Sequence, residues 1–200
     1  MLPEPFLPVW DAAEPYLRAR KNDVHVPLSY AFAEDLLAIH EAADRNVVLL
    51  AILLHDLGWA VVDQAALGTE RLTAGMLASD LRREHEREGA RLAREILTQL
   101  AFEAELIDEV ATIIDGHDTR LHALSLNDEL VKDADKLWRY TTTGVSVGCD
   151  MFGANPAEYA DWIAGKLDDV IFTEPARATA RQELEVTRRQ LRLDILSPRA

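Results

Sequence analysis

The stretch LLAILLHDLGWA, residues 49–60, decides the fold. It continues an apolar run, and together they predict a helix over 45–56 that is buried on all sides. Asp44 precedes the run as its expected N-cap, and Gly58 follows it as the expected stop. Such a helix belongs at the centre of a helical domain.

The central helix closes on a polar pair, His55 and Asp56. Burying either group without a hydrogen-bonding or charged partner costs free energy, so we expect other polar side chains to contact them inside the protein. Adjacent helical residues project about 100° apart, which lets both side chains flank one edge. A single metal ion at that edge could touch both.

The flanking segments place apolar residues at three- and four-residue spacing and show few strand patterns, which predicts an all-α helical bundle. Further helices are expected around 10–20, 29–43, 84–100, 103–118, 128–140, 157–170 and 176–193. Pro27 suits the first turn of the second helix. Ser125 or Asn127 can cap the start of the helix over 128–140. The stretch 141–156, rich in threonine and glycine, predicts a loop.

The length of 200 residues and the 48% hydrophobic content predict one domain over 1–200. Its core is expected at about 20–140, with the helices of 141–200 packed on that core. The last predicted helix is rich in arginine, which indicates a solvated charged face rather than a partner-binding helix. The arginines are Arg177, Arg181, Arg188, Arg189 and Arg192.

The acidic composition limits the classes of partner. Asp and Glu number 35 against 21 Lys and Arg, so the net charge of −14 disfavours extended nucleic acid and anionic membranes. Cys149 is the lone cysteine, and neither a signal peptide nor a membrane span is evident, so we expect a cytoplasmic protein. A homodimer is left open.

Groups that could bind metal fall mostly at the ends of the predicted helices, and side-by-side packing brings such ends together. The candidates are His25 before the second helix, His55 and Asp56 closing the third, His85 opening the fourth, His117 closing the fifth and Asp135 inside the sixth. Imidazole and carboxylate without thiolate suit Fe, Mn, Co, Ni or Zn.

Three motifs in order resemble the HD-domain metal-dependent phosphohydrolases. They are NDVHVPLSYAFAEDLL (22–37), AILLHDLGW (51–59) and VKDADKLWR (131–139), and the resemblance covers about residues 20–140. It implies an HD-like helical bundle whose central helix carries the His-Asp pair. It also implies four metal ligands, His25, His55, Asp56 and Asp135.

Two further motifs extend this resemblance. HEREGARLAREIL (85–97) resembles the family's H-E-x-x-G-A helix start, and IIDGHD (113–118) resembles its later histidine. With His85 and His117 the resemblance implies a six-ligand site for two divalent ions, which the carboxylate of Asp56 would bridge. The chain departs from the family after His117, where Asp118 replaces the commoner second histidine.

The preferred function is hydrolysis of a small phosphate ester, such as a nucleotide or related metabolite. Asp56 would act in catalysis as the bridging group, and Lys136 and Arg139 would contact phosphate, although both cations could equally be solvated helix residues. Three more cations are expected near the phosphate: Lys132, Arg120 and Arg87. The expected acceptors for histidine N–H groups are Asp23, Glu86, Asp115 and Asp118. The residues expected in a substrate lid are Tyr16, Arg18 and Arg20.

Two other functions stay open at this stage. Some HD-domain proteins with six ligands are mixed-valent diiron oxygenases that cleave organophosphonates or a polyol with O₂, and these would share every ligand named above. The third hypothesis is a sensor module without catalysis, which the complete set of six ligands disfavours.

Overall fold

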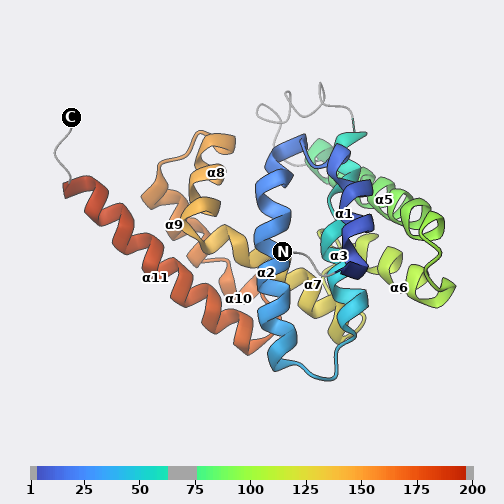
Figure 1. The fold of residues 1–200 in the computed structure, drawn as a ribbon. Coiled ribbons are helices and arrows are strands. Elements are labelled where there is room, and N and C mark those ends of the chain that lie inside the picture. The colour runs from blue at the N-terminus through green and yellow to red at the C-terminus, as the bar shows by residue number, and fades with distance from the viewer. Residues whose placement is uncertain (1–3, 63–75, 197–200) are drawn as a thin grey trace.

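The computed structural model of the chain describes residues 4–62 and 76–196, and every regular element within these ranges is a helix (Figure 1). The α-helices are α1 (Leu7–Ala13), α2 (Asn22–Ile39), α3 (Arg45–Leu54), α5 (Met76–Gln99), α6 (Ala104–Ile114), α7 (Leu126–Leu137), α8 (Thr142–Phe152), α9 (Pro156–Ala164), α10 (Leu167–Val170) and α11 (Glu174–Leu196). The short 3-10 turns are η1 (Glu4–Phe6), η2 (Glu14–Tyr16), η3 (Ala19–Lys21), η4 (Leu57–Ala60) and η5 (Trp138–Tyr140). The all-α prediction is confirmed.

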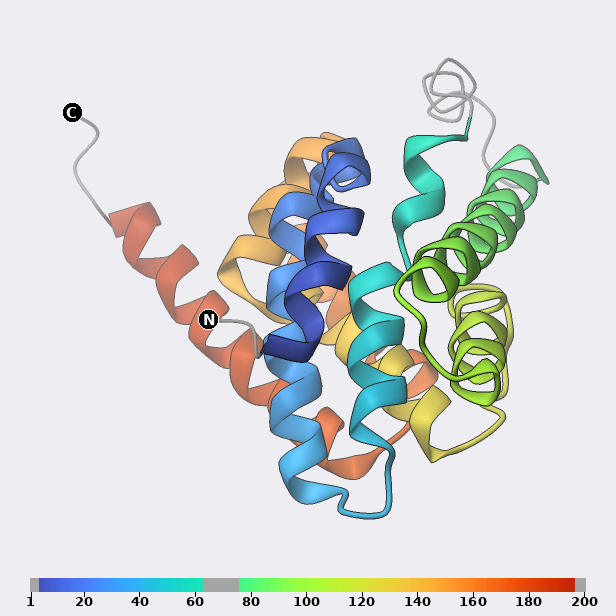
Figure 2. The ribbon, with the colours of Figure 1, turned by 45° about the vertical axis from the view of Figure 1, so that its right-hand side comes forward.

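Helix α3 is the central element. The Asp44 carboxylate accepts hydrogen bonds from the amides of Asn46 and Val47, so the predicted N-cap is confirmed. Every residue from Val47 to Leu54 is buried, as expected for a helix covered on all sides by apolar neighbours. Figure 2 shows α3 in cyan between blue α2 and the green pair α5 and α6, and α7 also packs against it.

Helix α3 ends at Leu54, so the prediction that Gly58 stops it is wrong. Gly58 lies in η4, and a Cβ atom built on it would stand 1.9 Å from the carbonyl oxygen of His85 in α5. In the same contact, a Cβ on Gly89 would stand 2.9 Å from the carbonyl oxygen of His55. The two glycines therefore allow the backbone of α5 to lie directly against the turn after α3.

Two helices begin earlier than the sequence indicated. Helix α2 starts at Asn22, so His25 lies within it and Pro27 stands inside the helix rather than in its first turn. A proline inside a helix lacks the N–H that would donate to the carbonyl four residues earlier, so α2 forms around Pro27 with one backbone hydrogen bond fewer. Helix α5 spans Met76–Gln99, so His85 lies in its body and does not open it.

Residues 141–156 are not a loop, because most of them form α8. The Thr141 hydroxyl caps its start, and Gly153 ends it with a positive φ of 64°. The glycines inside it permit close packing, since a Cβ on Gly148 would stand 2.4 Å from the ring of Tyr159 in α9. Tertiary packing therefore outweighs the weak helix propensity of this stretch.

The predicted helix over 157–170 is divided in two, because α9 ends at Ala164 and α10 begins at Leu167. Asp133 of α7 ties the following segment to the bundle, accepting hydrogen bonds from the amides of Phe172 and Thr173 and from the Thr173 hydroxyl. Asp133 is thus fully buried and binds backbone, which the sequence had not indicated.

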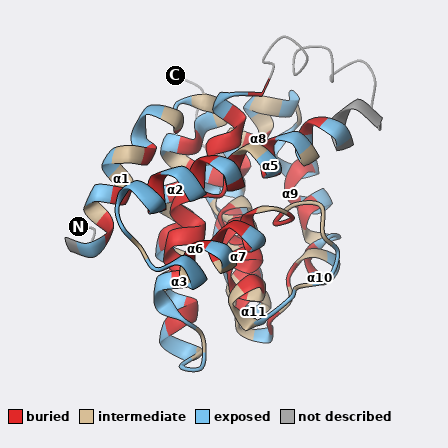
Figure 3. Cartoon of the chain, turned by 90° about the vertical axis from the view of Figure 1, so that its right-hand side faces the viewer, coloured by how far each residue is buried: buried red, intermediate tan, exposed pale blue. Residues whose placement is uncertain are grey.

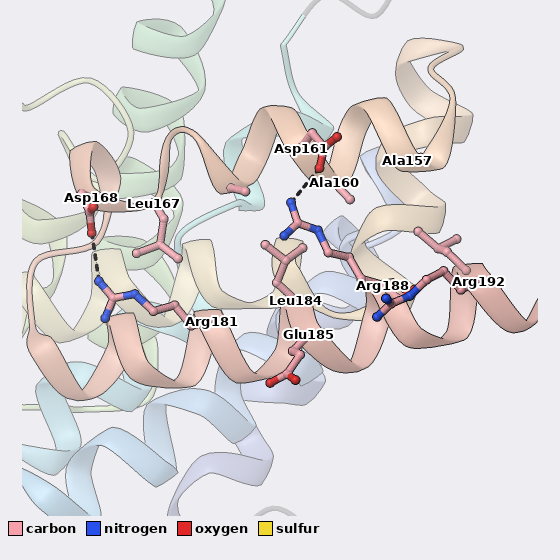
Figure 4. Close-up of a pocket in the computed structure, with 12 residues that line it drawn as sticks. Ala157, Ala160, Asp161, Leu167, Asp168, Arg181, Leu184, Glu185, Arg188 and Arg192 are labelled. Carbon is pink, nitrogen blue, oxygen red and sulfur yellow. Dashed lines mark hydrogen bonds and ion pairs between the residues drawn. The ribbon is translucent and has the colours of Figure 1, made fainter.

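Helix α11 packs on the bundle through a buried stripe that includes Ala176, Ala180 and Leu184 (Figure 3). Its arginines lie on the outer side, where Arg181 pairs with Asp168 and Arg188 with Asp161 across a groove of about 680 Å³ (Figure 4). Such exposed pairs stabilise a fold by about 0–1 kcal/mol each. Among the described helices none is both long and apolar enough to cross a membrane.

Candidate metal centre

Six polar side chains meet in the interior, and they are the six that the sequence singled out. Helix α2 provides His25, the turn after α3 provides His55 and Asp56, α5 provides His85, the turn after α6 provides His117, and α7 provides Asp135. All six residues are at most 9% exposed. The polar pair that closes α3 therefore does have buried partners.

The first half of the cluster contains His25, His55 and Asp135. The two imidazole Nε2 atoms lie 2.9 Å apart. Asp135 Oδ1 lies 3.1 Å from Nε2 of His25 and 3.4 Å from Nε2 of His55. Asp56 turns its Oδ2 atom toward the same point, at 3.6 and 3.7 Å from those two nitrogens.

The second half contains His85 and His117, whose Nε2 atoms lie 3.4 Å apart. Asp56 turns its other oxygen, Oδ1, toward them at 3.6 Å from His85 and 3.5 Å from His117. The Oδ2 atom of Asp118 completes this half at 3.8 Å from His85 Nε2. Asp56 therefore lies between the halves with one carboxylate oxygen directed at each.

Backbone carbonyls orient two of the rings. His55 Nδ1 lies 2.8 Å from the Ile52 carbonyl oxygen, and His117 Nδ1 lies 2.9 Å from the Ile114 carbonyl oxygen. A carbonyl only accepts, so each Nδ1 carries the hydrogen, and in the neutral ring the Nε2 lone pair points into the cluster. His25 Nδ1 meets the Ser29 hydroxyl at 3.2 Å.

The charge states of His25, His85 and Asp56 also suit a metal. Burial lowers the pKa of His25. Burial, and to a smaller extent the charge of His117, lowers the pKa of His85 to about 4. Burial would raise the pKa of Asp56, but His55 and the other imidazoles hold it well below its usual range. His55 differs: burial lowers its pKa, but Asp56 and Asp135 outweigh burial and raise it to about 9.

Converging imidazole nitrogens and carboxylate oxygens make a donor set that fits divalent metal ions. Potential ligand atoms gather in three overlapping groups, each within 4.8 Å: His25, His55 and Asp135; His55, Asp56 and His117; and His85, His117 and Asp118. The buried histidine and aspartate residues are thus able to hold metal ions.

The turn that carries His117 is fixed by two buried charges. The Glu86 carboxylate accepts hydrogen bonds from the amides of Asp118 and Thr119 and from the Thr119 hydroxyl. Lys132 donates to the carbonyl oxygens of Gly116 and His117, at 2.7 and 3.0 Å. The sequence had suggested that Glu86 accepts from a histidine and that Lys132 is free for phosphate, and both suggestions are wrong.

The remaining predicted cations differ in what they contact. Lys136 donates to Asp118 Oδ1 at 2.6 Å and also to Asp135. Arg120 donates hydrogen bonds to the Asp128 carboxylate and to backbone carbonyl oxygens. Arg87 is exposed on α5. Arg139 has no hydrogen bond or ion pair with any described residue, and although burial lowers its pKa, the charges of Asp135 and Asp118 outweigh burial and raise it.

A cleft of about 510 Å³ opens onto the cluster. The buried residues His25, Asp56 and Asp135 line its inner part, and the more exposed Phe152 of α8 and Trp162 of α9 line its outer part. Of the lid predicted from the sequence, Arg20 lines the cleft, whereas Tyr16 and Arg18 do not.

Aromatic rings that sequence reasoning missed enclose two of the histidines. Trp59 stacks on His85 with centroids 3.9 Å apart, and Trp138 covers His25 at 4.7 Å. Arg20 in turn lies 4.1 Å above the Trp59 ring. Trp59 and Trp138 stand within the quoted motifs, but only the packing of distant elements shows which histidine each one touches.

Comparison with known families gives one match. The family model described as HD domain matches residues 27–139, which is more than half of the chain. The matched span contains five of the six clustered residues and begins two positions after His25. Searches of curated proteins and of solved structures found no match.

Proposed function

Because the chain belongs to the HD-domain family, we propose that it is a metal-dependent phosphohydrolase that cleaves a small phosphate ester at a site for two divalent ions. The single observation that carries the proposal is the position of Asp56. Its two oxygens face two separate groups of imidazoles, at 3.5–3.7 Å. A carboxylate placed in this way is suited to bridge two ions.

When bound, two such ions would act as Lewis acids toward phosphoryl oxygens and lower the pKa of a water molecule. The metal ligands in this proposal are His25, His55, Asp56, His85, His117 and Asp135. Their ring-orienting hydrogen bonds and their burial prepare the ligands in advance, so little reorganisation accompanies binding. The metal is drawn from Fe, Mn, Co, Ni and Zn.

Arg139 is the better of the two proposed phosphate contacts. It lines the cleft beside Asp135, and its guanidinium has no hydrogen bond or ion pair elsewhere in the described chain, so its donors are available to phosphoryl oxygens. Lys136 instead holds Asp118 and Asp135 in place. It would contribute positive charge near the phosphate and fix the two carboxylates.

The outer cleft supports a substrate with a planar group, such as a nucleotide. The Tyr159 ring neighbours both Phe152 and Trp162, with ring centroids 6.2 and 5.7 Å away. Phe152 is 63% exposed and Trp162 is 56% exposed, and both line the cleft, so accessible ring surface is present there. A base stacked there would gain about 1–3 kcal/mol, and 510 Å³ is a normal volume for a small-molecule site.

Phosphate release under anaerobic conditions tests the proposal. We expect protein loaded with Mn²⁺, Co²⁺ or Ni²⁺ to hydrolyse members of a panel of nucleotides and simple phosphate esters. Trp162→Ala should lower the preference for nucleotides over simple esters, with exposed Val186→Ala on α11 as its control. If no ion supports phosphate release, while iron-loaded protein consumes O₂ and gives a mixed-valent diiron signal, the hydrolase proposal is wrong and the diiron oxygenase function takes its place.

A further inference from the structure

We propose that Asp118 is a metal ligand in the second half of the cluster, alongside His85 and His117. The inference rests on the proposed two-ion function and goes beyond it, because it adds a seventh ligand to the six predicted ones. It also gives a role to Asp118 itself, which stands where the HD-domain family more commonly has a second histidine after His117.

The position of Asp118 is determined by its surroundings. Its Oδ2 atom lies 3.8 Å from His85 Nε2, and one of its oxygens belongs to a set with both histidines within 4.8 Å. Its amide donates to the buried Glu86 carboxylate at 2.8 Å, and its side chain is 15% exposed. The carboxylate is therefore fixed against the imidazoles by the backbone that carries it.

Asp118 and Asp135 occupy equivalent places in the two halves. Asp135 directs Oδ1 at the imidazoles of His25 and His55, while its Oδ2 accepts from Lys136. Asp118 directs Oδ2 at His85, while its Oδ1 accepts from the same Lys136 ammonium. One lysine thus joins the outer oxygens of the two carboxylates, and the inner oxygens both face the cluster.

This equivalence gives each half the same set of donors. The first half has two imidazoles, Asp135 and Oδ2 of Asp56, and the second has two imidazoles, Asp118 and Oδ1 of Asp56. Without Asp118 the second half would have one carboxylate oxygen fewer than the first. We therefore expect the two halves to bind divalent ions with similar affinity.

Calorimetric titration of the metal-free full-length chain with Mn²⁺ tests the inference. Wild type should bind about two ions per chain, and Asp118→Asn should bind the second ion about 100-fold more weakly or worse, because loss of even an indirect partner costs 10–100-fold. The first ion should bind as before. Asp118→Ser should give the same result, which guards against an effect peculiar to one variant.

Two control variants separate a ligand from a positioning residue. Asp115→Asn changes a partly exposed carboxylate three positions away that pairs with Arg83, and it should leave both affinities unchanged. Lys136→Met removes the ammonium that Asp118 and Asp135 share while leaving all seven ligands, so it should weaken both ions to a similar extent, and each by less than Asp118→Asn weakens the second ion. The absorption of Co²⁺ in the second half should also change in Asp118→Asn, since a neutral amide oxygen replaces a charged carboxylate oxygen near the ion.

The possible results distinguish this inference from the function on which it rests. If wild type binds fewer than two ions, the two-ion function itself fails. If wild type binds two and Asp118→Asn binds both as tightly, only the role of Asp118 fails. An equal loss of affinity in Asp118→Asn and Lys136→Met would also overturn it, because Asp118 would then act only by holding the lysine.

Discussion

Gly58→Ala should damage the cluster from outside, without touching any of its side chains. The new Cβ would stand 1.9 Å from the carbonyl oxygen of His85, and real Cβ atoms essentially never approach closer than 3.0 Å. Either η4 or α5 must therefore move by at least 1.1 Å. The atom in the way is backbone, so no side-chain rotation can relieve the clash.

The movement has a cost in stability and in metal binding. Overpacking of this kind costs about 1–3 kcal/mol, and each kcal/mol lowers the Tm of a chain of this size by about 2–4 °C. The same displacement separates His85 from Asp56, whose facing atoms now lie 3.6 Å apart. We expect the second ion to bind at least about tenfold more weakly, while the first half stays intact.

Thermal unfolding and Mn²⁺ titration measure both effects, and Gly165→Ala is the matched control. Gly165 has an ordinary φ of −68°, and a Cβ there would meet nothing closer than 3.6 Å, so alanine should be neutral or stabilise by about 0.4–1 kcal/mol. Unchanged Tm and unchanged affinity in Gly58→Ala would refute the close-packing argument.

Three further predictions follow from individual side chains. Glu86→Gln should lower the free energy of unfolding by about 1–3 kcal/mol, because the amide nitrogen that replaces Oε2 cannot accept hydrogen bonds from the Thr119 hydroxyl and from Arg83. Denaturant unfolding measures this change. The metal-free protein should lose stability as pH falls from 6.5 toward 4, because His85, with a pKa of about 4, stays neutral in the folded protein whereas the histidine of the unfolded chain binds a proton. A series of Tm measurements against pH tests this, and the same slope in His85→Asn as in wild type would contradict it. Arg139→Met should raise KM for phosphate esters without changing metal content, with exposed Arg87→Met as control, and an unchanged KM would remove Arg139 from the substrate site.

Much of the helical fold could be predicted because local patterns carry it. The unbroken apolar run before His55 could only be a helix buried on all sides, and the Asp44 cap marks its start. The position of polar residues at the ends of predicted helices and the family resemblance likewise identified six residues that the fold brings together. These features depend on residues close in sequence, or on motifs whose order is preserved.

The parts that could not be predicted depend on contacts between distant elements. Helix α8 contains Gly144 and Gly148, which indicate a loop until the backbone of Trp138 and the ring of Tyr159 are seen to occupy the space of their missing side chains. In the same way, the capture of Lys132 by carbonyls of the His117 turn requires a knowledge of how α6 and α7 pack.

The metal content of Asp56→Ala tests the central claim most directly. Elemental analysis of protein loaded with Mn²⁺ and freed of excess ion should give about two ions per chain for wild type, as expected of a two-metal site. Asp56→Ala should retain almost none and release no phosphate, because both halves lose the oxygen that faces them. A folded Asp56→Ala protein that still carries two ions and still hydrolyses phosphate esters would contradict the account.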